Sequence, residues 1–144
     1  QVYVWQGLRI MGLGGSIRYN SEETFQYTER EMRRRVRRLW FKAHRAGGID
    51  LLLTHSPAAG LNDGDDRAHK GFACFNDLLE EYQPKWFVHG HVHLSYNANL
   101  PRVCTHGQTT VINATERYTF EIPDPDPVAR KRFFWNDPAF PTKN

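Results

Sequence analysis

The chain has 144 residues, of which 40% are hydrophobic and 24% charged, a balance typical of one globular domain with an ordinary core. Its formal net charge of +3 is too small to identify a polyanionic partner, and without a run of about 18 apolar residues a membrane-spanning helix is excluded. The 2 cysteines are too few for a disulfide framework or a zinc ribbon, so we expect reduced thiols and a cytoplasmic protein.

The first third of the chain predicts a hairpin followed by a long helix. Val2–Trp5 and Leu8–Leu13 are β-type runs, and Gln6-Gly7 between them is a hairpin signal. From Thr28 to Arg45, apolar residues recur at spacings of three and four, which indicates one buried helix face. These apolar residues are Met32, Val36, Leu39, Trp40 and Ala43. Gly47-Gly48 should end this helix.

The rest of the chain predicts further strands and one more helix. Ile49–Leu53 and Lys85–Val88 are short apolar runs typical of buried parallel strands, with a helix expected between them at Phe72–Tyr82. Thr109–Asn113 and Tyr118–Ile122 are predicted to close the sheet as an antiparallel pair. Helices that alternate with apolar strands predict an α/β fold with a largely parallel sheet and an antiparallel edge.

Two regions are predicted from this pattern. Residues 1–122 should form the domain, and residues 123–144, with prolines at 123, 125, 127, 138 and 141, should form an extended tail. The aromatic residues of that tail, Phe133, Phe134 and Trp135, are expected to hold it against the domain.

Histidine stands at every second position from 89 to 93. Alternate residues of a strand share a face, so His91 and His93 are expected to face one site, although His89 has the same parity and spacing alone leaves open which pair matters. His55 follows the other buried strand, and the carboxyl ends of parallel strands meet at one rim of a sheet. Neutral imidazole binds zinc, manganese and iron well, so these three histidines predict a metal site.

The same residues resemble the second half of the calcineurin-like metallophosphoesterases. The resemblance rests on Thr54-His55-Ser56-Pro57 and Gly90-His91-Val92-His93, supported by Gly7–Ser16 and by the predicted closing pair, and it covers residues 1–122. It implies part of a four-layer αββα sandwich, with a mixed sheet and outer helices. It also implies a hydrolase in which two divalent ions (Mn, Fe, Zn, Ni or Co) and a metal-bridging hydroxide cleave phosphate mono- or diesters.

The resemblance also implies a role for each histidine. His55 and His91 would bind the second ion, and His93 would bind the first. His69, in the stretch His69-Lys70-Gly71-Phe72, would lie close to the substrate entrance and contact the substrate, while His89 lies outside the motif and would be a supporting residue.

The earlier motifs of that family, D-x-H, G-D-x-x-D and G-N-H-D/E, are absent from this sequence. Gly64-Asp65 follows His55 instead of preceding it, and Ala68 stands where the second aspartate should be. Two divalent ions repel each other unless carboxylates lie between and around them, so three neutral histidines should hold at most one ion weakly. We therefore expect the C-terminal part of a phosphoesterase, without catalytic residues of its own and inactive alone. Its partner should be the N-terminal half of the same domain or a second copy of this chain.

An alternative function follows from the basic residues of the first predicted helix, Arg33, Arg34, Arg35, Arg37, Arg38 and Arg45. Such a cluster is typical of a module that binds nucleic acid or another polyanion. Against this alternative, Glu29 and Glu31 balance part of the charge, and base-stacking aromatic residues do not alternate with the arginines.

Overall fold

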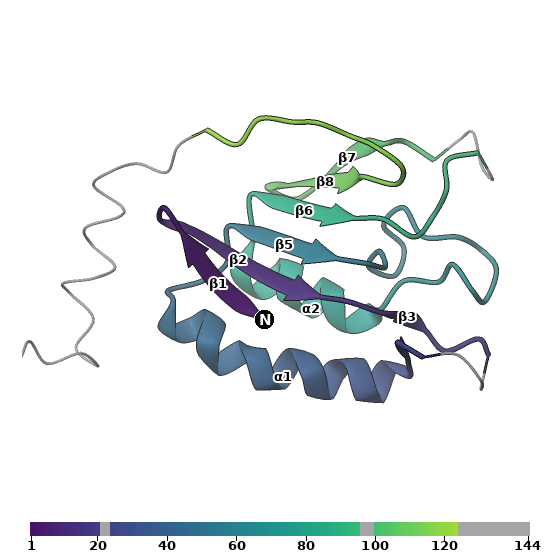
Figure 1. Cartoon of the computed structure of the whole chain (residues 1–144), viewed down its shortest axis with the longest axis horizontal. Helices are drawn as coiled ribbons and strands as arrows, with labels where there is room; N and C mark the ends of the chain where they lie inside the picture. The colour runs from purple at the N-terminus through teal and green to yellow at the C-terminus, as the bar shows by residue number, and fades with distance from the viewer. Residues whose placement is uncertain (21–23, 96–99, 124–144) are drawn as a thin grey trace, which may run out of the picture.

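The computed structural model describes residues 1–20, 24–95 and 100–123. The expected tail therefore lies outside the described residues, apart from Pro123. A six-stranded mixed sheet with the order β1-β2-β5-β6-β8-β7 forms the frame of the molecule (Figure 1). The strands are β1 Val2–Trp5, β2 Leu8–Leu13, β5 Leu51–Thr54, β6 Trp86–His89, β7 Val103–His106 and β8 Thr109–Asn113. The inner four run parallel and the two edge strands antiparallel, as the sequence pattern predicts.

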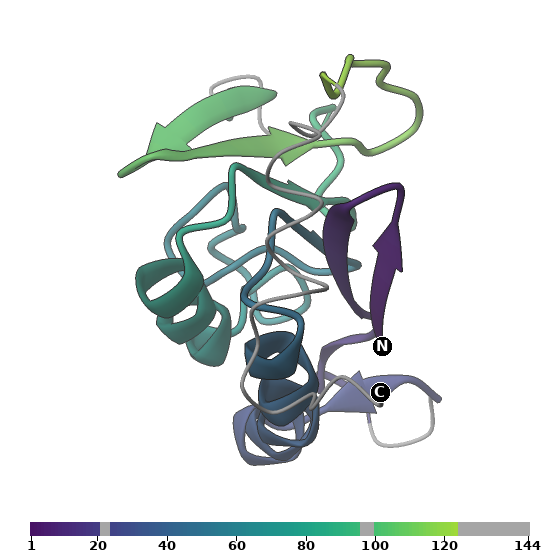
Figure 2. The ribbon, with the colours of Figure 1, turned by 90° about the vertical axis from the view of Figure 1, so that its left-hand side faces the viewer.

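Two helices cover one face of this sheet, α1 (Glu29–Arg45) and α2 (Ala73–Tyr82) (Figure 2). At the start of α1, the Thr28 hydroxyl accepts a bond from the backbone of Glu31 (3.3 Å), and the Glu31 carboxylate accepts one from the backbone of Thr28 (2.7 Å). This reciprocal capping fixes the amino end of the helix. Trp40, expected on the buried face, is 40% exposed and donates its indole N–H to Glu81.

Helix α2 takes its amino-terminal cap from α1. Its N-cap residue, Phe72, has no side-chain acceptor, and the free amides of Ala73 and Cys74 donate instead to the Glu29 carboxylate (3.0 and 2.8 Å). A carboxylate in this position satisfies orphan amides and also suits the helix dipole. Burial raises the pKa of the neighbouring Cys74 thiol to about 12, and both cysteines are thiols, as expected.

The two faces of the sheet are covered to different extents. On the helix side, Met11, Leu52, Phe87 and Val111 are fully buried against α1 and α2. On the other side, Leu51, Val88 and Ile112 pack against Phe120 and Ile122 of the segment that follows β8. Leu53, in an inner strand, is 46% exposed, so this second face is open around β5.

Of the predicted closing pair, Thr109–Asn113 is a strand but Tyr118–Ile122 is not. Tyr118–Ile122 has no regular structure, and β8 pairs with β7 through the two-residue turn Gly107-Gln108. Phe120 and Ile122 are apolar because they cover the open face, and not because they form a strand. Two short parallel strands, β3 (Ser16–Ile17) and β4 (Gln26–Tyr27), were also not predicted. Among the described residues, no helix has the length and apolar character needed to cross a membrane.

Candidate functional site

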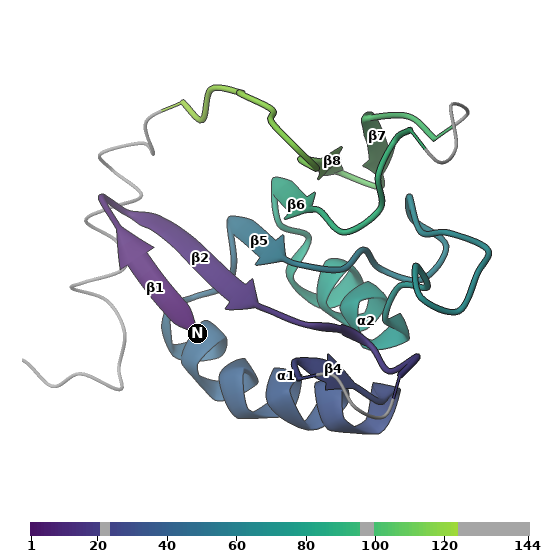
Figure 3. The ribbon, with the colours of Figure 1, turned by 45° about the vertical axis from the view of Figure 1, so that its right-hand side comes forward.

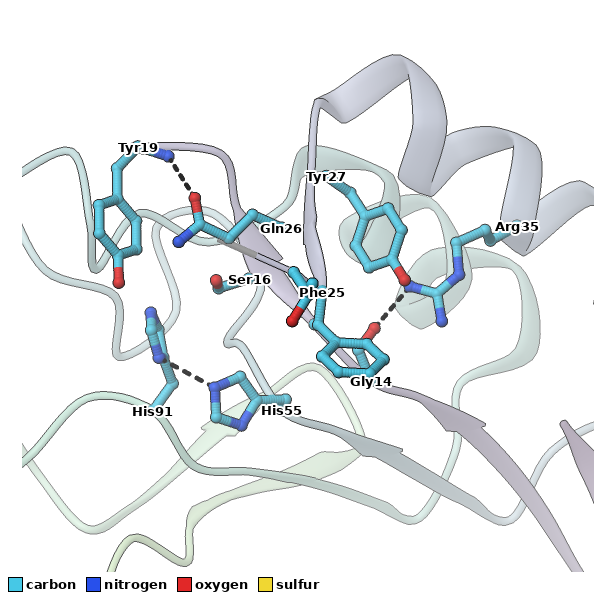
Figure 4. A pocket seen from close by; sticks show the side chains of 11 residues that line it. Gly14, Ser16, Tyr19, Phe25, Gln26, Tyr27, Arg35, His55 and His91 are labelled. Atoms are coloured by element: carbon cyan, nitrogen blue, oxygen red, sulfur yellow. Dashed lines mark hydrogen bonds between the residues drawn. The ribbon is translucent and has the colours of Figure 1, made fainter. Parts of the chain in front are cut away.

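The carboxyl ends of β2, β5 and β6 meet at one rim of the sheet, beside β3 and β4 (Figure 3). Gly14-Gly15 follows β2, His55 follows β5, and His91 comes two residues after β6. A cavity of about 720 Å³ opens at this rim (Figure 4). It is lined by Gly14, Gly15, Ser16, Tyr19, Thr24, Phe25, Gln26, Tyr27, Arg35, His55 and His91.

His55 and His91 face each other in this cavity. The Nε2 atom of His55 lies 3.1 Å from Nδ1 of His91, and the ring centroids are 4.7 Å apart (Figure 4). The Nε2 atom of His91 lies 2.8 Å from the carbonyl oxygen of Ala68. A carbonyl oxygen only accepts, so Nε2 of His91 carries the hydrogen and Nδ1 keeps its lone pair. The Nε2–H of His55 therefore donates to that lone pair.

Both rings are held in the neutral form. Burial lowers the pKa of His55, and the nearby His91 lowers it further. The pKa of His91 is also lowered, mainly by burial, although its bond to the Ala68 carbonyl opposes that shift. A neutral imidazole is the form that binds a metal ion, so the site favours coordination over proton storage.

The third predicted ligand, His93, is not among the residues that line the cavity. Strand β6 ends at His89, and His91 has a φ of 69°, so strand alternation does not relate His91 to His93. The His93 ring is 46% exposed, with Nδ1 3.9 Å from a Glu116 carboxylate oxygen. Within residues 1–20, 24–95 and 100–123, no group of three or more His, Cys, Asp or Glu side chains is placed to hold a metal ion.

His69, the predicted substrate contact, lies beside His91 outside the residues that line the cavity. The two ring centroids are 5.3 Å apart. Nδ1 of His69 donates to the Asp66 carboxylate at 2.7 Å, and the same carboxylate accepts from the backbone of Ala68 at 2.9 Å. This loop therefore holds both the His69 ring and the carbonyl that orients His91.

The His55–His91 pair fits two ligands of one metal ion. Ligand nitrogens at about 2.0–2.1 Å from a tetrahedral zinc ion lie roughly 3.3 Å apart, close to the observed 3.1 Å. The bond from His91 to a backbone carbonyl is the usual support of a metal-binding histidine. The described lining of the cavity does not fit a pair of ions, because two ions require acidic ligands and no carboxylate is among the lining residues.

His89 is part of the interior. Its side chain is 1% exposed, its Nδ1 atom lies 3.1 Å from the carbonyl oxygen of Gly90, and burial lowers its pKa to about 4. Nε2 of His89 has no hydrogen-bond partner among the described residues. His89 does not line the cavity, and the supporting role expected for it stays a prediction.

Sequence reasoning missed the other half of the cavity wall. Phe25, Tyr27 and Arg35 line it; the sequence pattern singles out only Arg35, as one of the arginines of the first predicted helix. Gly15 is the one residue whose type is tied to this wall: its φ is 104°, and a Cβ atom there would lie 2.6 Å from the carbonyl oxygen of Phe25. A glycine directly after a strand thus marks where β4 crosses close to the rim.

Comparisons with known proteins find relatives that match part of the sequence. No family model matches the chain. Metallophosphoesterase domain-containing protein 1 of Homo sapiens is 32% identical over 71 residues, which are 47% of this chain and 20% of that protein. The UPF0046 protein C25E10.12 of Caenorhabditis elegans is 37% identical over 73 residues, 46% of this chain and 24% of that protein. The matches thus span about a fifth to a quarter of these curated relatives.

The fold has a counterpart among solved structures. One crystal structure superimposes with a TM-score of 0.56 at 20% sequence identity, covering 81% of this chain and 44% of the other. A likeness at this identity supports the fold alone, and it agrees with the predicted α/β class and its mixed sheet. The partial sequence matches relate just under half of this chain to the metallophosphoesterases.

Proposed function

We propose that this chain supplies the histidine ligands of a metal-dependent phosphoesterase that hydrolyses phosphate mono- or diesters. The observation that carries the proposal is the approach of two neutral, partly buried imidazoles to 3.1 Å in a cavity whose described wall has no carboxylate. Such a pair is a weak stabilising contact, because burying polar rings offsets most of what one hydrogen bond contributes. If the His55 hydrogen moves from Nε2 to Nδ1, the two facing nitrogens both present lone pairs at a separation that suits a divalent cation.

Each histidine has a proposed role. His55 Nε2 and His91 Nδ1 would bind one ion, His93 would bind the other, and His69, oriented by Asp66, would contact the substrate. When bound, divalent ions supply Lewis-acid activation of the phosphoryl group and of the attacking water. Manganese, iron, zinc, nickel and cobalt all accept imidazole nitrogen, and at most one ion would bind weakly to this chain alone.

The absence of carboxylates from the described cavity lining suggests a partner that supplies them. We propose that the amino-terminal half of a phosphoesterase domain packs against the open sheet face and contributes the carboxylates. Three exposed apolar residues support this surface: Leu53 on inner strand β5, and Trp5 and Val103 on the two edge strands. Exposed apolar area on an inner strand is unusual for a monomer and is typical of an interface. A second copy of this chain would cover the same face but bring no additional carboxylate motif.

Metal binding gives the first test. Titration of the chain with Mn²⁺ by calorimetry should show uptake that falls about 100-fold in His55→Ala and in His91→Ala, because each removes a ligand of the same ion. His44→Ala is the matched control, since His44 is an exposed ring stacked on Trp40. Equal uptake by all four proteins would contradict the proposed site.

Hydrolysis gives the second test. We expect the isolated chain to show no turnover of a nitrophenyl phosphate ester with Mn²⁺, and turnover to appear when an acidic amino-terminal half is co-expressed with it. Turnover by the isolated chain that disappears in His91→Ala would contradict the predicted inactivity. Sedimentation of the isolated chain as a dimer would favour the second copy as the occupant of the open face.

A second candidate function, polyanion binding, rests on the outer surface of α1. Glu29 and Glu31 are occupied by caps, so the outward face keeps its positive charge. Its exposed basic residues are Arg30, Arg34, Arg37, Arg38, Lys42 and Arg45. Salt-dependent binding of duplex DNA that survives the loss of His55, His91 and His93 would favour this function.

A further inference from the structure

The cavity continues beyond the histidine pair to a wall of different chemistry. Phe25, Tyr27 and Arg35 form that wall, and in Figure 4 they lie on the far side of Ser16 from His91. Arg35 contributes a permanent positive charge, and the described lining has no acidic side chain. A cavity of about 720 Å³ falls within the range of small-molecule sites, roughly 300–1,000 Å³. The positive charge of Arg35 favours an anionic ligand in this cavity.

Phe25 presents an aromatic ring to solvent at the mouth of this cavity. The residue is 75% exposed and has a φ of 62°, a backbone conformation that bulky side chains rarely adopt. Burial does not account for its position, because most of the ring is in water. Strained residues of this kind concentrate at ligand-binding sites, where the fold holds a side chain in a required place.

Arg35 is held in position from two sides. Its Nη1 atom donates to the carbonyl oxygen of Gly14 at 2.5 Å, and its guanidinium carbon lies 4.1 Å from the centroid of the Tyr27 ring. These contacts leave further guanidinium N–H groups for a ligand. A cation fixed in this way loses little conformational freedom when an anion binds.

We propose that this wall is a specificity site for phosphate esters that carry a planar aromatic group. The ring stacks on Phe25, Arg35 attracts the negative charge of the ester, and the phosphate lies at the His55–His91 pair. This inference rests on the proposed function, because it assigns the phosphate to that pair. It adds the class of leaving group, which follows from an exposed aromatic ring beside a fixed cation.

The test compares two esters that differ in the ring. Phenyl phosphate and methyl phosphate are titrated into the full chain in the presence of Mn²⁺, with binding measured by calorimetry. We expect phenyl phosphate to bind about tenfold more tightly, which is within the usual range for stacking on one aromatic side chain. Phe25→Leu, which keeps apolar bulk but removes the ring, should reduce that ratio to about twofold or less. Arg35→Gln should weaken both esters.

Phe41→Leu is the matched control, because Phe41 is an exposed phenylalanine on α1 that does not line the cavity. It should leave both affinities unchanged. A preference for phenyl phosphate that persists in Phe25→Leu would overturn the aromatic site, and so would failure of phenyl phosphate to bind.

Failure of this inference is distinguishable from failure of the proposed function. If both esters bind equally and both are lost in His55→Ala, the aromatic site is wrong and the phosphate end of the cavity is supported. If the ring preference depends on Phe25 but neither Mn²⁺ nor the esters respond to His55→Ala, the placement of the phosphate is wrong, and the proposed function fails with it.

Discussion

The two ends of the inner parallel strands are built on opposite electrostatic principles. At the amino end of β5, Asp50 accepts bonds from the backbone N–H of Arg9 (2.9 Å), from its Nε atom (2.7 Å) and from its Nη2 atom (2.5 Å). Arg9 also donates to the carbonyl oxygen of Gly47. Burial tends to raise the pKa of Asp50, but the bonds from Arg9 prevail and lower it. The charges of Arg9 and Asp50 thus neutralise each other.

The carboxyl end lacks such neutralisation. His55 and His91 are neutral rings that meet without an opposite charge, and both His91 and Phe25 have positive φ angles. Ligands of open α/β sheets bind outside the carboxyl ends of the strands. One end of the sheet is thus arranged for stability and the other for binding. Substitutions at the carboxyl end should therefore change metal affinity, and substitutions at the amino end should change the free energy of unfolding.

The largest expected effect is at the binding end. His91→Ala should reduce Mn²⁺ affinity about 100-fold, or about 2.7 kcal/mol. The free energy of unfolding should fall by only about 1 kcal/mol, because the hydrogen bonds of the ring with His55 and with the Ala68 carbonyl each contribute little net stability. Urea unfolding of the metal-free protein, measured beside calorimetry, separates the two effects. A large loss of stability with unchanged affinity would make the two ends alike and remove the distinction.

Substitution at the amino end should lower stability and leave metal affinity unchanged. Asp50→Asn should lower the free energy of unfolding by about 2 kcal/mol, because the part-buried Arg9 loses its charged partner, and Mn²⁺ affinity should stay unchanged. Asp65→Asn, in an exposed part of the loop after β5, is the control and should unfold as the unmodified chain does. Weaker metal binding by Asp50→Asn would show that the two ends are coupled.

The pH dependence of stability should identify the same pair. Because the pKa of Asp50 is lower in the folded protein than in the unfolded chain, its contribution is complete above the unfolded pKa of about 3.9 and is lost as pH falls through the folded value. The difference in unfolding free energy between the unmodified chain and Asp50→Asn should thus be constant above about pH 5 and shrink in more acidic solution. Unfolding curves recorded from pH 7 to pH 3 measure it, and a constant difference throughout would argue against the ion pair.

The smallest effect is expected for Arg9→Lys. Lysine keeps the charge but cannot form the planar, two-pronged contact with a carboxylate, so we expect a loss of about 1 kcal/mol. The same urea experiment measures it. A loss as large as that of Asp50→Asn would mean that geometry, and not charge, accounts for most of the stability at this end.

Much of the fold is readable from the sequence because its signals are local. The amphipathic pattern of α1, the apolar runs of β5 and β6, and the Gln6-Gly7 turn each depend on neighbouring residues. Strand β7 was missed because Phe120 and Ile122 present an equally apolar pattern, and only their packing on the open face distinguishes the two segments.

The candidate site was predictable to a smaller extent. His55 and His91 come together because strand order places both at the rim, which the sequence pattern indicates. His91 has a positive φ, which strand alternation does not predict, and the role of His93 as a ligand stays a prediction. Phe25 and Arg35 reach the cavity from β4 and α1, through a crossing at Gly15 that no local pattern describes.

The cap that Glu29 provides for α2 has a consequence for the order in which the protein assembles. The first amides of α2 have their acceptor on another helix, so α2 gains full stability only after α1 has docked. Solvent exchange of the Ala73 and Cys74 amide protons therefore reports on the attachment of α1. Loosening the first helix would also free the first turn of α2, where the loop that carries the Ala68 carbonyl bonded to His91 ends.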